Sequence, residues 1–106
     1  MNFQLKTYWV EYSANYDHFA KTTQKFKIGL KGNMGELLDI YFTTGGQAIM
    51  NNGEKSFTAY LNIAQFHGAL ATLEHLMARG KVHVVMTKAG NDYNIAFTPD
   101  SFIAAP

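Results

Sequence analysis

The stretch "QKFKIGLKGNMGELLDIYFT", residues 24–43, decides the fold of this chain. Its apolar residues Phe26, Ile28 and Leu30 occupy every second position. The lysines of the same segment fall on the opposite side: Lys25, Lys27 and Lys31. Strict alternation over residues 24–31 predicts a strand with one face buried and the other exposed to water.

The second half of the stretch predicts another strand over residues 36–43. Gly32-Asn33, followed by Gly35, is typical of a turn between the two strands. The apolar positions are Leu38, Ile40 and Phe42, while Asp39 and Tyr41 alternate with them. The stretch therefore predicts a strand pair with one apolar face.

Outward from this pair, the sequence predicts five more strands, over residues 3–12, 47–51, 54–61, 81–88 and 92–98. Turns are expected at Gly45-Gly46 and, between the last two strands, at Ala89-Gly90-Asn91. Asn52-Gly53 predicts a type I′ hairpin turn. Residues 13–23 have no clean period and are expected to form a long loop.

One helix is predicted over about residues 63–79. Asn62 is placed as its N-cap, Gln65 as the capping-box partner, and Gly80 as a left-handed C-cap. The apolar residues at helical spacing predict a buried stripe of Ile63, Phe66, Leu70, Leu73 and Met77. Residues 1–106 are thus expected to form a single α+β domain. It would have an antiparallel sheet of about seven strands, one main helix packed on one face, and a C-terminal β-hairpin.

Composition narrows the class of protein. Of the 106 residues, 47% are hydrophobic and 16% are charged, which indicates a globular chain. The chain contains no cysteine, which excludes disulfides and thiol catalysis. No apolar run approaches the roughly 18 residues that a membrane helix needs, so we expect no membrane partner. Residues 1–8 lack the continuous apolar block of a signal peptide, and we expect a cytoplasmic protein.

The helix carries the few residues that could bind a metal. His67 and His75 are eight positions apart, and Glu74 is seven from His67, whereas helical ligand pairs need a spacing of three or four. We therefore interpret these residues as the polar edge of the buried stripe and expect no metal. Asp17-His18 in the predicted loop has the residue types of an acid–base pair, but a single adjacent pair in a polar loop is usually solvated. No catalytic motif is present, so we expect no cofactor and no enzymatic activity.

The outer side of the predicted sheet combines lysine with tyrosine. Alternation places Lys25, Lys27, Tyr41 and Tyr60 opposite the core face. In the first strand, alternation places Phe3, Leu5 and Trp9 on one face and Lys6, Tyr8 and Tyr12 on the other. Ammonium groups neutralise phosphates and aromatic rings stack on bases, so this face predicts single-stranded nucleic-acid binding. The predicted binding residues are Lys6, Tyr8, Tyr12, Lys25, Lys27, Lys31, Tyr41 and Tyr60. The tyrosines are equally compatible with cross-strand pairs or with a dimer interface.

The segment "KFKIGLKGNMGELLDIYF…GEKSFTAYLNIAQF", within residues 24–79, resembles the Whirly and positive-cofactor-four group of single-stranded-DNA-binding proteins. The resemblance lies in the apolar strand positions, in Lys55 before the last strand, and in Leu61-Asn62-x-x-Gln65-Phe66 at the helix start. It implies four antiparallel strands followed by a helix, single-stranded-DNA binding and a homodimer. The first strand and the hairpin after Gly80 are additions to that pattern, and Asp39 stands where a basic residue would help.

Two functions are therefore predicted. The first is a small non-enzymatic binding protein for single-stranded nucleic acid, acting as a homodimer. The alternative is a protein-interaction module, such as an inhibitor or accessory factor encoded by a phage or mobile element, because tyrosine is enriched at protein interfaces.

Overall fold

The computed structural model describes residues 2–13, 25–44, 48–90 and 92–99. The predicted loop at 13–23 lies outside these residues, apart from the backbone of Ser13. Asp17, His18 and the expected turn at Gly45-Gly46 are also outside them.

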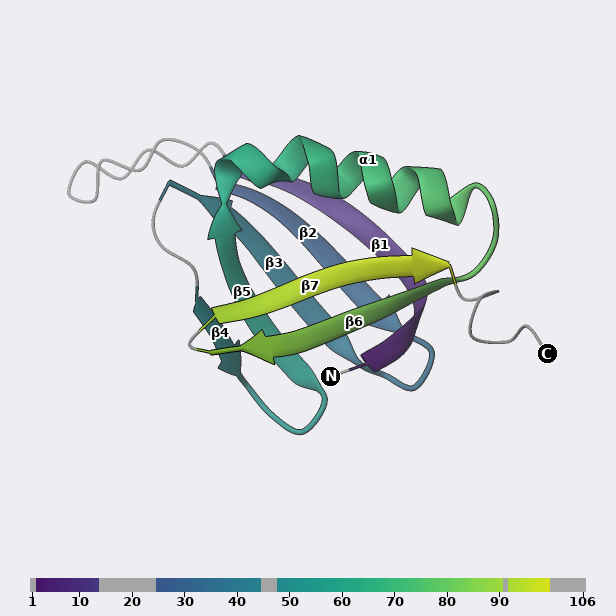
Figure 1. Ribbon diagram of the computed structural model, residues 1–106, viewed down its shortest axis with the longest axis horizontal. Coiled ribbons are helices and arrows are strands. Elements are labelled where there is room, and N and C mark those ends of the chain that lie inside the picture. The colour runs from purple at the N-terminus through teal and green to yellow at the C-terminus, as the bar shows by residue number, and fades with distance from the viewer. Residues whose placement is uncertain (1, 14–24, 45–47, 91, 100–106) are drawn as a thin grey trace.

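Seven strands and one helix form an α+β fold (Figure 1). The elements are β1 (Asn2–Ser13), β2 (Lys25–Gly32), β3 (Leu37–Thr43), β4 (Ala48–Asn51), β5 (Ser56–Asn62), the 3₁₀ turn Ile63–Gln65, α1 (Phe66–Met77), β6 (Val82–Ala89) and β7 (Asp92–Pro99). The strands make one sheet in the order β4-β5-β3-β2-β1-β6-β7. The strands and the C-terminal hairpin are where the sequence predicts them, within one or two residues.

The expectation of a purely antiparallel sheet is wrong, because β3 and β5 are parallel. The chain leaves β3, forms β4 at the sheet edge, and returns as β5 between the two. Burial explains this order: β5 places Ala59 in the core beside Ile40 of β3, whereas β4 is short and mostly exposed. A short, exposed strand suits an edge, and a strand with an apolar face belongs inside the sheet.

The predicted type I′ turn at Asn52-Gly53 is also wrong. Asn51 pairs with Phe57, and the four residues 52–55 between β4 and β5 form a wider loop. Gly53 does not have the positive φ that a type I′ turn requires. Its N–H instead donates to Oδ1 of Asn51 at 2.9 Å, which is an Asx turn.

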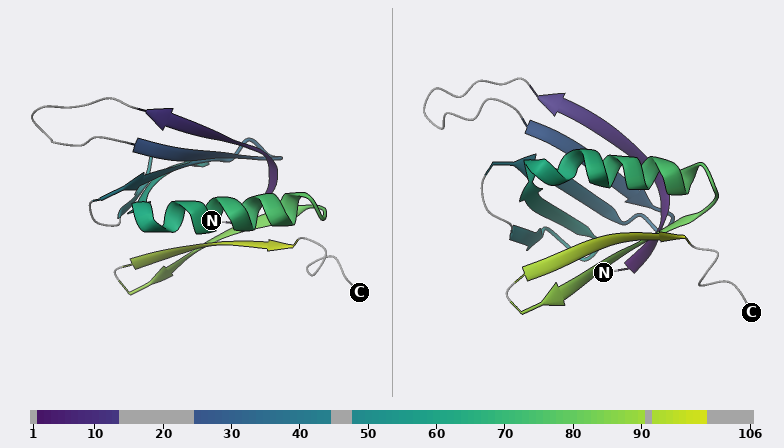
Figure 2. Two further views of the ribbon diagram at one scale, coloured as in Figure 1. Left: turned by 90° about the horizontal axis from the view of Figure 1, so that it is seen from above. Right: turned by 45° about the horizontal axis from the view of Figure 1, so that its top comes forward.

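The sheet curls so strongly that its two ends face each other. β1 pairs with β6 over residues 2–4 and with β2 over residues 5–13, so it forms the corner of the curl. Viewed from above, α1 lies between the β1–β2 side and the β6–β7 hairpin (Figure 2). The core fills the space inside the curl and consists of Phe3, Leu5, Ile28, Leu30, Leu38, Ile40, Phe42, Ala59, Phe66, Leu73, Val82, Val84 and Met86.

Local signals set the ends of the helix. Oδ1 of Asn62 accepts the N–H of Ala64 at 2.9 Å, which confirms Asn62 as the N-cap, although the first turn is 3₁₀. Gln65 makes no side-chain capping bond at the start of α1. Gly80 has a positive φ of 147°, but the predicted C-cap at this residue is wrong. The last α-helical residue is Met77, and the C-cap is Ala78 in a right-handed conformation.

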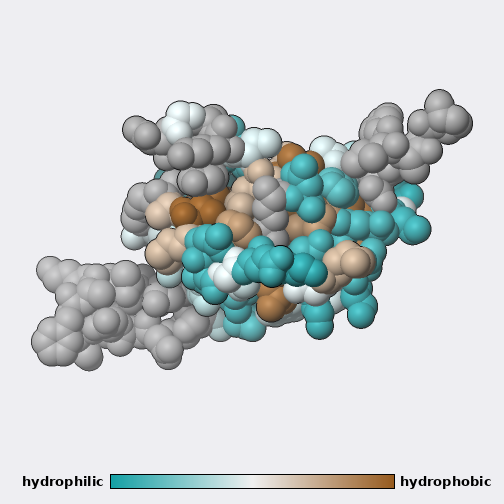
Figure 3. Space-filling model, turned by 90° about the horizontal axis from the view of Figure 1, so that it is seen from below, coloured by the Kyte–Doolittle hydropathy of each residue, from teal (hydrophilic) through white to brown (hydrophobic). Residues whose placement is uncertain are grey.

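The predicted helix stripe faces the core. Phe66 and Leu73 are fully buried, and Ile63, Leu70 and Met77 pack around them. Within the described residues, no helix is both long and apolar enough to cross a membrane. On the side of the molecule away from α1, hydrophilic residues separate the hydrophobic patches (Figure 3).

Phe66 joins the helix to the middle of the sheet. Its ring stacks on Phe26 at 4.8 Å and meets the edge of Phe42 at 5.3 Å. We expect Phe66→Ala to lower the free energy of unfolding by about 3–5 kcal/mol, as measured by urea denaturation, because it leaves a cavity among these rings. Glu74→Ala on the exposed side of α1 should change it by less than about 0.5 kcal/mol. A loss below about 1 kcal/mol for Phe66→Ala would contradict this packing.

Candidate functional site

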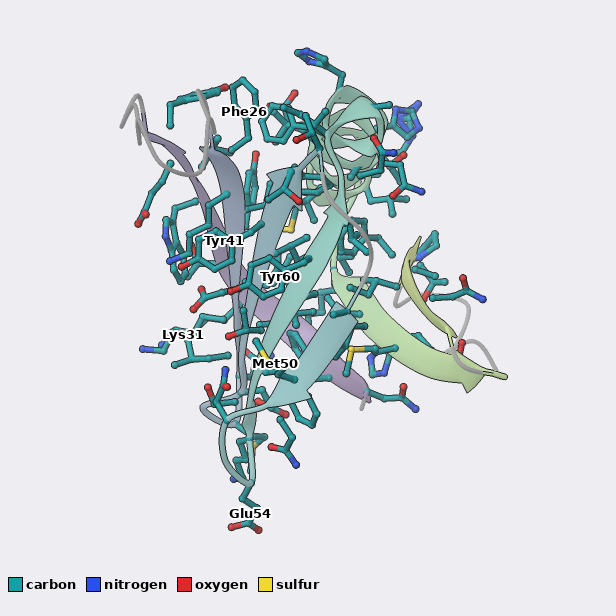
Figure 4. The ribbon with its side chains drawn as sticks, turned by 90° about the vertical axis from the view of Figure 1, so that its left-hand side faces the viewer. Phe26, Lys31, Tyr41, Met50, Glu54 and Tyr60 are labelled. Carbon is teal, nitrogen blue, oxygen red and sulfur yellow. The ribbon has the colours of Figure 1, made fainter. Side chains whose placement is uncertain are left out.

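Four neighbouring strands bring a row of large side chains to the outer face of the sheet. Trp9 of β1, Lys27 of β2, Tyr41 of β3 and Tyr60 of β5 form this aromatic row. Lys27 is directly opposite Tyr41, and Tyr41 is directly opposite Tyr60. Tyr41 and Tyr60 lie side by side on the outside of the strands, whereas Phe26 lies beside the helix (Figure 4). Alternation in β2, β3 and β5 is therefore as predicted.

Lys27 is the centre of the row. Its Nζ lies 5.7 Å from the ring centroid of Trp9 and 5.6 Å from that of Tyr41. Two carboxylates also hold it, Asp39 at 3.3 Å and Glu11 at 3.8 Å. Only 16% of the Lys27 side chain is exposed. A cation between two rings and two carboxylates has little remaining capacity to bind a phosphate.

The pKa of Lys27 reflects these contacts. Burial is the largest effect and lowers the pKa of the ammonium. The hydrogen bond and charge of Asp39, with further contributions from Tyr41 and Glu11, outweigh burial and raise the pKa above its ordinary value. Lys27 is therefore a permanently charged internal partner at neutral pH.

Trp9 lies flat on the strand beside it because that strand has a glycine there. Gly29 is opposite Trp9, and a Cβ on Gly29 would lie 2.2 Å from the indole ring. Nε1 of Trp9 donates to Oε1 of Glu11 at 3.0 Å, which satisfies the polar end of the indole. Glycine within a strand often marks such a close approach.

The other end of the row is apolar. The Tyr41 and Tyr60 rings stack with centroids 5.5 Å apart and an angle of 20° between their planes. On the same face, Met50 on β4 is 47% exposed, and Leu37, further along β3 beyond Asp39, is 37% exposed. We call the aromatic row, its carboxylates and these neighbours the outer face. Its members are Trp9, Glu11, Lys27, Lys31, Leu37, Asp39, Tyr41, Met50, Thr58 and Tyr60.

The predicted orientation of β1 is wrong beyond Leu5. The register with β2 shifts by one residue between Leu5 and Thr7, which is a β-bulge. Because side chains alternate with a period of two, one extra residue reverses every later side chain. Trp9 therefore joins the outer face, while Tyr8 packs on the core and Tyr12 contacts Phe26 and Phe66.

The remaining predicted binding residues lie in different places. Lys6 at the bulge and Lys31 near the end of β2 are exposed. The backbone of Lys25 pairs with Ser13, but its side chain is outside the described part of the structure. Of the eight predicted residues, Lys27, Lys31, Tyr41 and Tyr60 are on the outer face. The outer face also contains Trp9 and Met50, which strand alternation did not predict as binding residues. Gly29 could have indicated the position of Trp9, because a glycine within a strand often marks the close approach of a large side chain.

The helix polar residues are apart from this face. His67, Glu74 and His75 are all exposed on α1. Across the described ranges, no three His, Asp or Glu side chains are grouped closely enough to hold a metal ion.

No family model, no curated protein and no solved structure matches this chain. The resemblance to the Whirly and positive-cofactor-four group stays a prediction.

Gly29 offers a direct test of the Trp9 position, since Trp9 is the only tryptophan of the chain. We expect Gly29→Ala to displace the indole and to shift its fluorescence emission to longer wavelength, because the new Cβ and the ring cannot both fit. Gly53→Ala is the matched control, because a Cβ there meets nothing within 4 Å. Unchanged emission in Gly29→Ala would place the indole elsewhere.

The Lys27–Asp39 pair predicts a pH dependence of stability. Because the folded-state pKa of Lys27 is raised, the contribution of the pair is fully present below the unfolded-state pKa of about 10.4. It is lost as the pH rises through the higher folded-state pKa. We expect Asp39→Asn to lower the unfolding free energy at pH 8 by at most about 1 kcal/mol, because solvent screens the partly exposed carboxylate.

This difference between wild type and Asp39→Asn should shrink above about pH 10.5, as measured by urea denaturation across pH 8 to 11. Glu54→Gln, in the exposed β4–β5 loop, is the control, because it removes a carboxylate that makes no ion pair with Lys27. A difference that stays constant to pH 11 would mean that the charge of Lys27 does not contribute.

Proposed function

We propose that this protein is a small non-enzymatic binding module whose outer face docks onto a partner protein. The observation that carries the proposal is the enclosure of Lys27 by Trp9, Tyr41, Asp39 and Glu11. The enclosure turns the central cation of the face into a structural element and leaves rings and apolar side chains as the contact surface.

Among its described side chains, the charge on the outer face is balanced. Its described side chains include two cations, Lys27 and Lys31, and two carboxylates, Glu11 and Asp39. A polyanion requires a net positive surface, because affinity comes from phosphate neutralisation. A neutral face with paired charges fits a protein surface better, since charged residues are depleted at interface centres.

The outer face combines half-buried aromatic side chains with an exposed methionine, and these are of the kinds enriched at protein interfaces. Trp9, Tyr41, Tyr60 and Met50 belong to residue types that contribute strongly to binding. Their stacking and cation–π contacts hold them in place before a partner arrives. Less side-chain entropy is then lost on binding, which favours affinity.

Single-stranded nucleic acid is the second candidate, and the adjacent Tyr41 and Tyr60 rings favour it. A base could stack on the free side of such a pair, and Lys31 on the same face is exposed. This function and the protein partner differ in their response to salt, because only phosphate contacts release counterions.

Outer-face variants test the proposal. The partner is first identified by cross-linking or co-purification. We expect Tyr60→Ala and Met50→Lys each to lower the affinity for this partner by about tenfold or more, since hot-spot side chains contribute roughly 2 kcal/mol. Thr87→Lys, an exposed position on β6, is the matched control and should bind like wild type. Equal binding by all variants would place the interface elsewhere.

Two further measurements separate the alternatives. Titration with oligo-dT, followed by Trp9 fluorescence, should show no binding at low salt. Binding with a salt slope that falls by about one unit in Lys31→Gln would favour nucleic acid instead. Analytical ultracentrifugation tests whether the partner is a second copy, in which case Met50→Lys would yield monomers.

A further inference from the structure

A groove of about 500 Å³ lies between α1 and β7, away from the outer face. One wall is the side of α1 that carries Gly68, Ala69 and Thr72. The opposite wall is β7 at Ile95, Ala96 and Phe97. Leu61 is also part of the lining, and the volume falls within the roughly 300–1,000 Å³ of typical ligand sites.

The helix wall is open because its residues are small. Gly68 stands in the first turn of α1, and glycine in a helix costs stability relative to alanine. A Cβ at Gly68 would meet nothing within 4 Å, so the structure does not require glycine for packing. The Oγ1 of Thr72 donates to the carbonyl oxygen of Gly68 at 2.9 Å, which turns that hydroxyl toward its own helix. The wall therefore offers shape and apolar contact and few polar groups.

The strand wall offers backbone hydrogen bonds. β7 is the last strand of the sheet, and among the described residues it pairs only with β6. An edge strand presents alternate N–H and C=O groups without a ladder partner. Only another extended polypeptide matches this spacing along its whole length, and pockets beside the edge then select its side chains.

Size and charge define the occupant further. The helix wall from Gln65 to Thr72 rises by about 10 Å, which equals about three residues of an extended strand. None of the lining residues is charged. A charged side chain buried there would lose its hydration without gaining a partner.

We propose that this groove binds a short extended segment of a partner protein, with about three consecutive uncharged residues, as an added strand on β7. Side chains on alternate positions of the segment fill the space over Gly68 and Ala69. The site is separate from the outer face. The bound segment lies between β7 and α1.

Selection of displayed twelve-residue peptides on the immobilised full-length protein tests this proposal. We expect enriched peptides to share an uncharged core with alternating apolar residues, and N-methylation of that core to abolish binding. Gly68→Leu should lower their affinity by about tenfold or more, because its side chain occupies the groove. It should not lower the Tm, since leucine favours the helix more than glycine.

Ala71→Leu, which adds the same side chain on the exposed side of α1, is the matched control and should bind peptides like wild type. Tyr60→Ala should also leave peptide binding unchanged, which separates this site from the outer face. Failure to enrich any peptide, or equal binding to Gly68→Leu, would overturn the proposal. Binding only to a chain shortened to residues 1–99 would assign the groove to residues 100–106. Peptide binding that appears only on dilution to monomer would assign the groove to a second copy. Either result would also overturn the assignment to a partner.

Discussion

The bulge in β1 between Leu5 and Thr7 is the constraint on which the rest of the structure depends. It lies at the point where β1 leaves β6 and begins to pair with β2, so the extra residue bends the sheet at its corner. Gly32 pairs with Leu5 at this corner, and a Cβ there would lie 2.7 Å from Phe3. The missing side chain lets Phe3 enter the core where the sheet turns. Without the bend, the β6–β7 hairpin would not face the helix, and no groove would exist beside β7.

The same bulge creates the outer face. It turns Trp9 outward onto Gly29 and Lys27, and it turns Tyr8 inward. Tyr12 then adds its ring to the cluster of Phe26 and Phe66 at the start of α1. One inserted residue therefore supplies an aromatic to each side of the sheet. This links the packing of the helix with the composition of the candidate interface.

Sequence patterns predicted those parts of the fold that depend on local alternation. β2 and β3 face the core as expected, since Ile28, Leu30, Leu38 and Ile40 occupy every second position. The helix stripe and the Asn62 cap are equally local. The bulge was hidden because Tyr, Trp and Val suit either face of a strand. The parallel β3–β5 pair was hidden because turn signals report only chain reversal, while burial decides which strand becomes the edge.

The candidate site was predicted for its residue types more than for its chemistry. Strand alternation predicted a face that combines lysine with tyrosine. The antiparallel registers of β1 and β3 with β2 place Glu11 and Asp39 beside Lys27. Charges counted along the sequence do not show this contact. A lysine held by two carboxylates and two rings fixes the positions of its neighbours. A free lysine would instead offer its charge to a ligand. The described part of the outer face is consequently aromatic and nearly neutral. For the protein partner that we propose, these properties favour shape complementarity over electrostatic attraction.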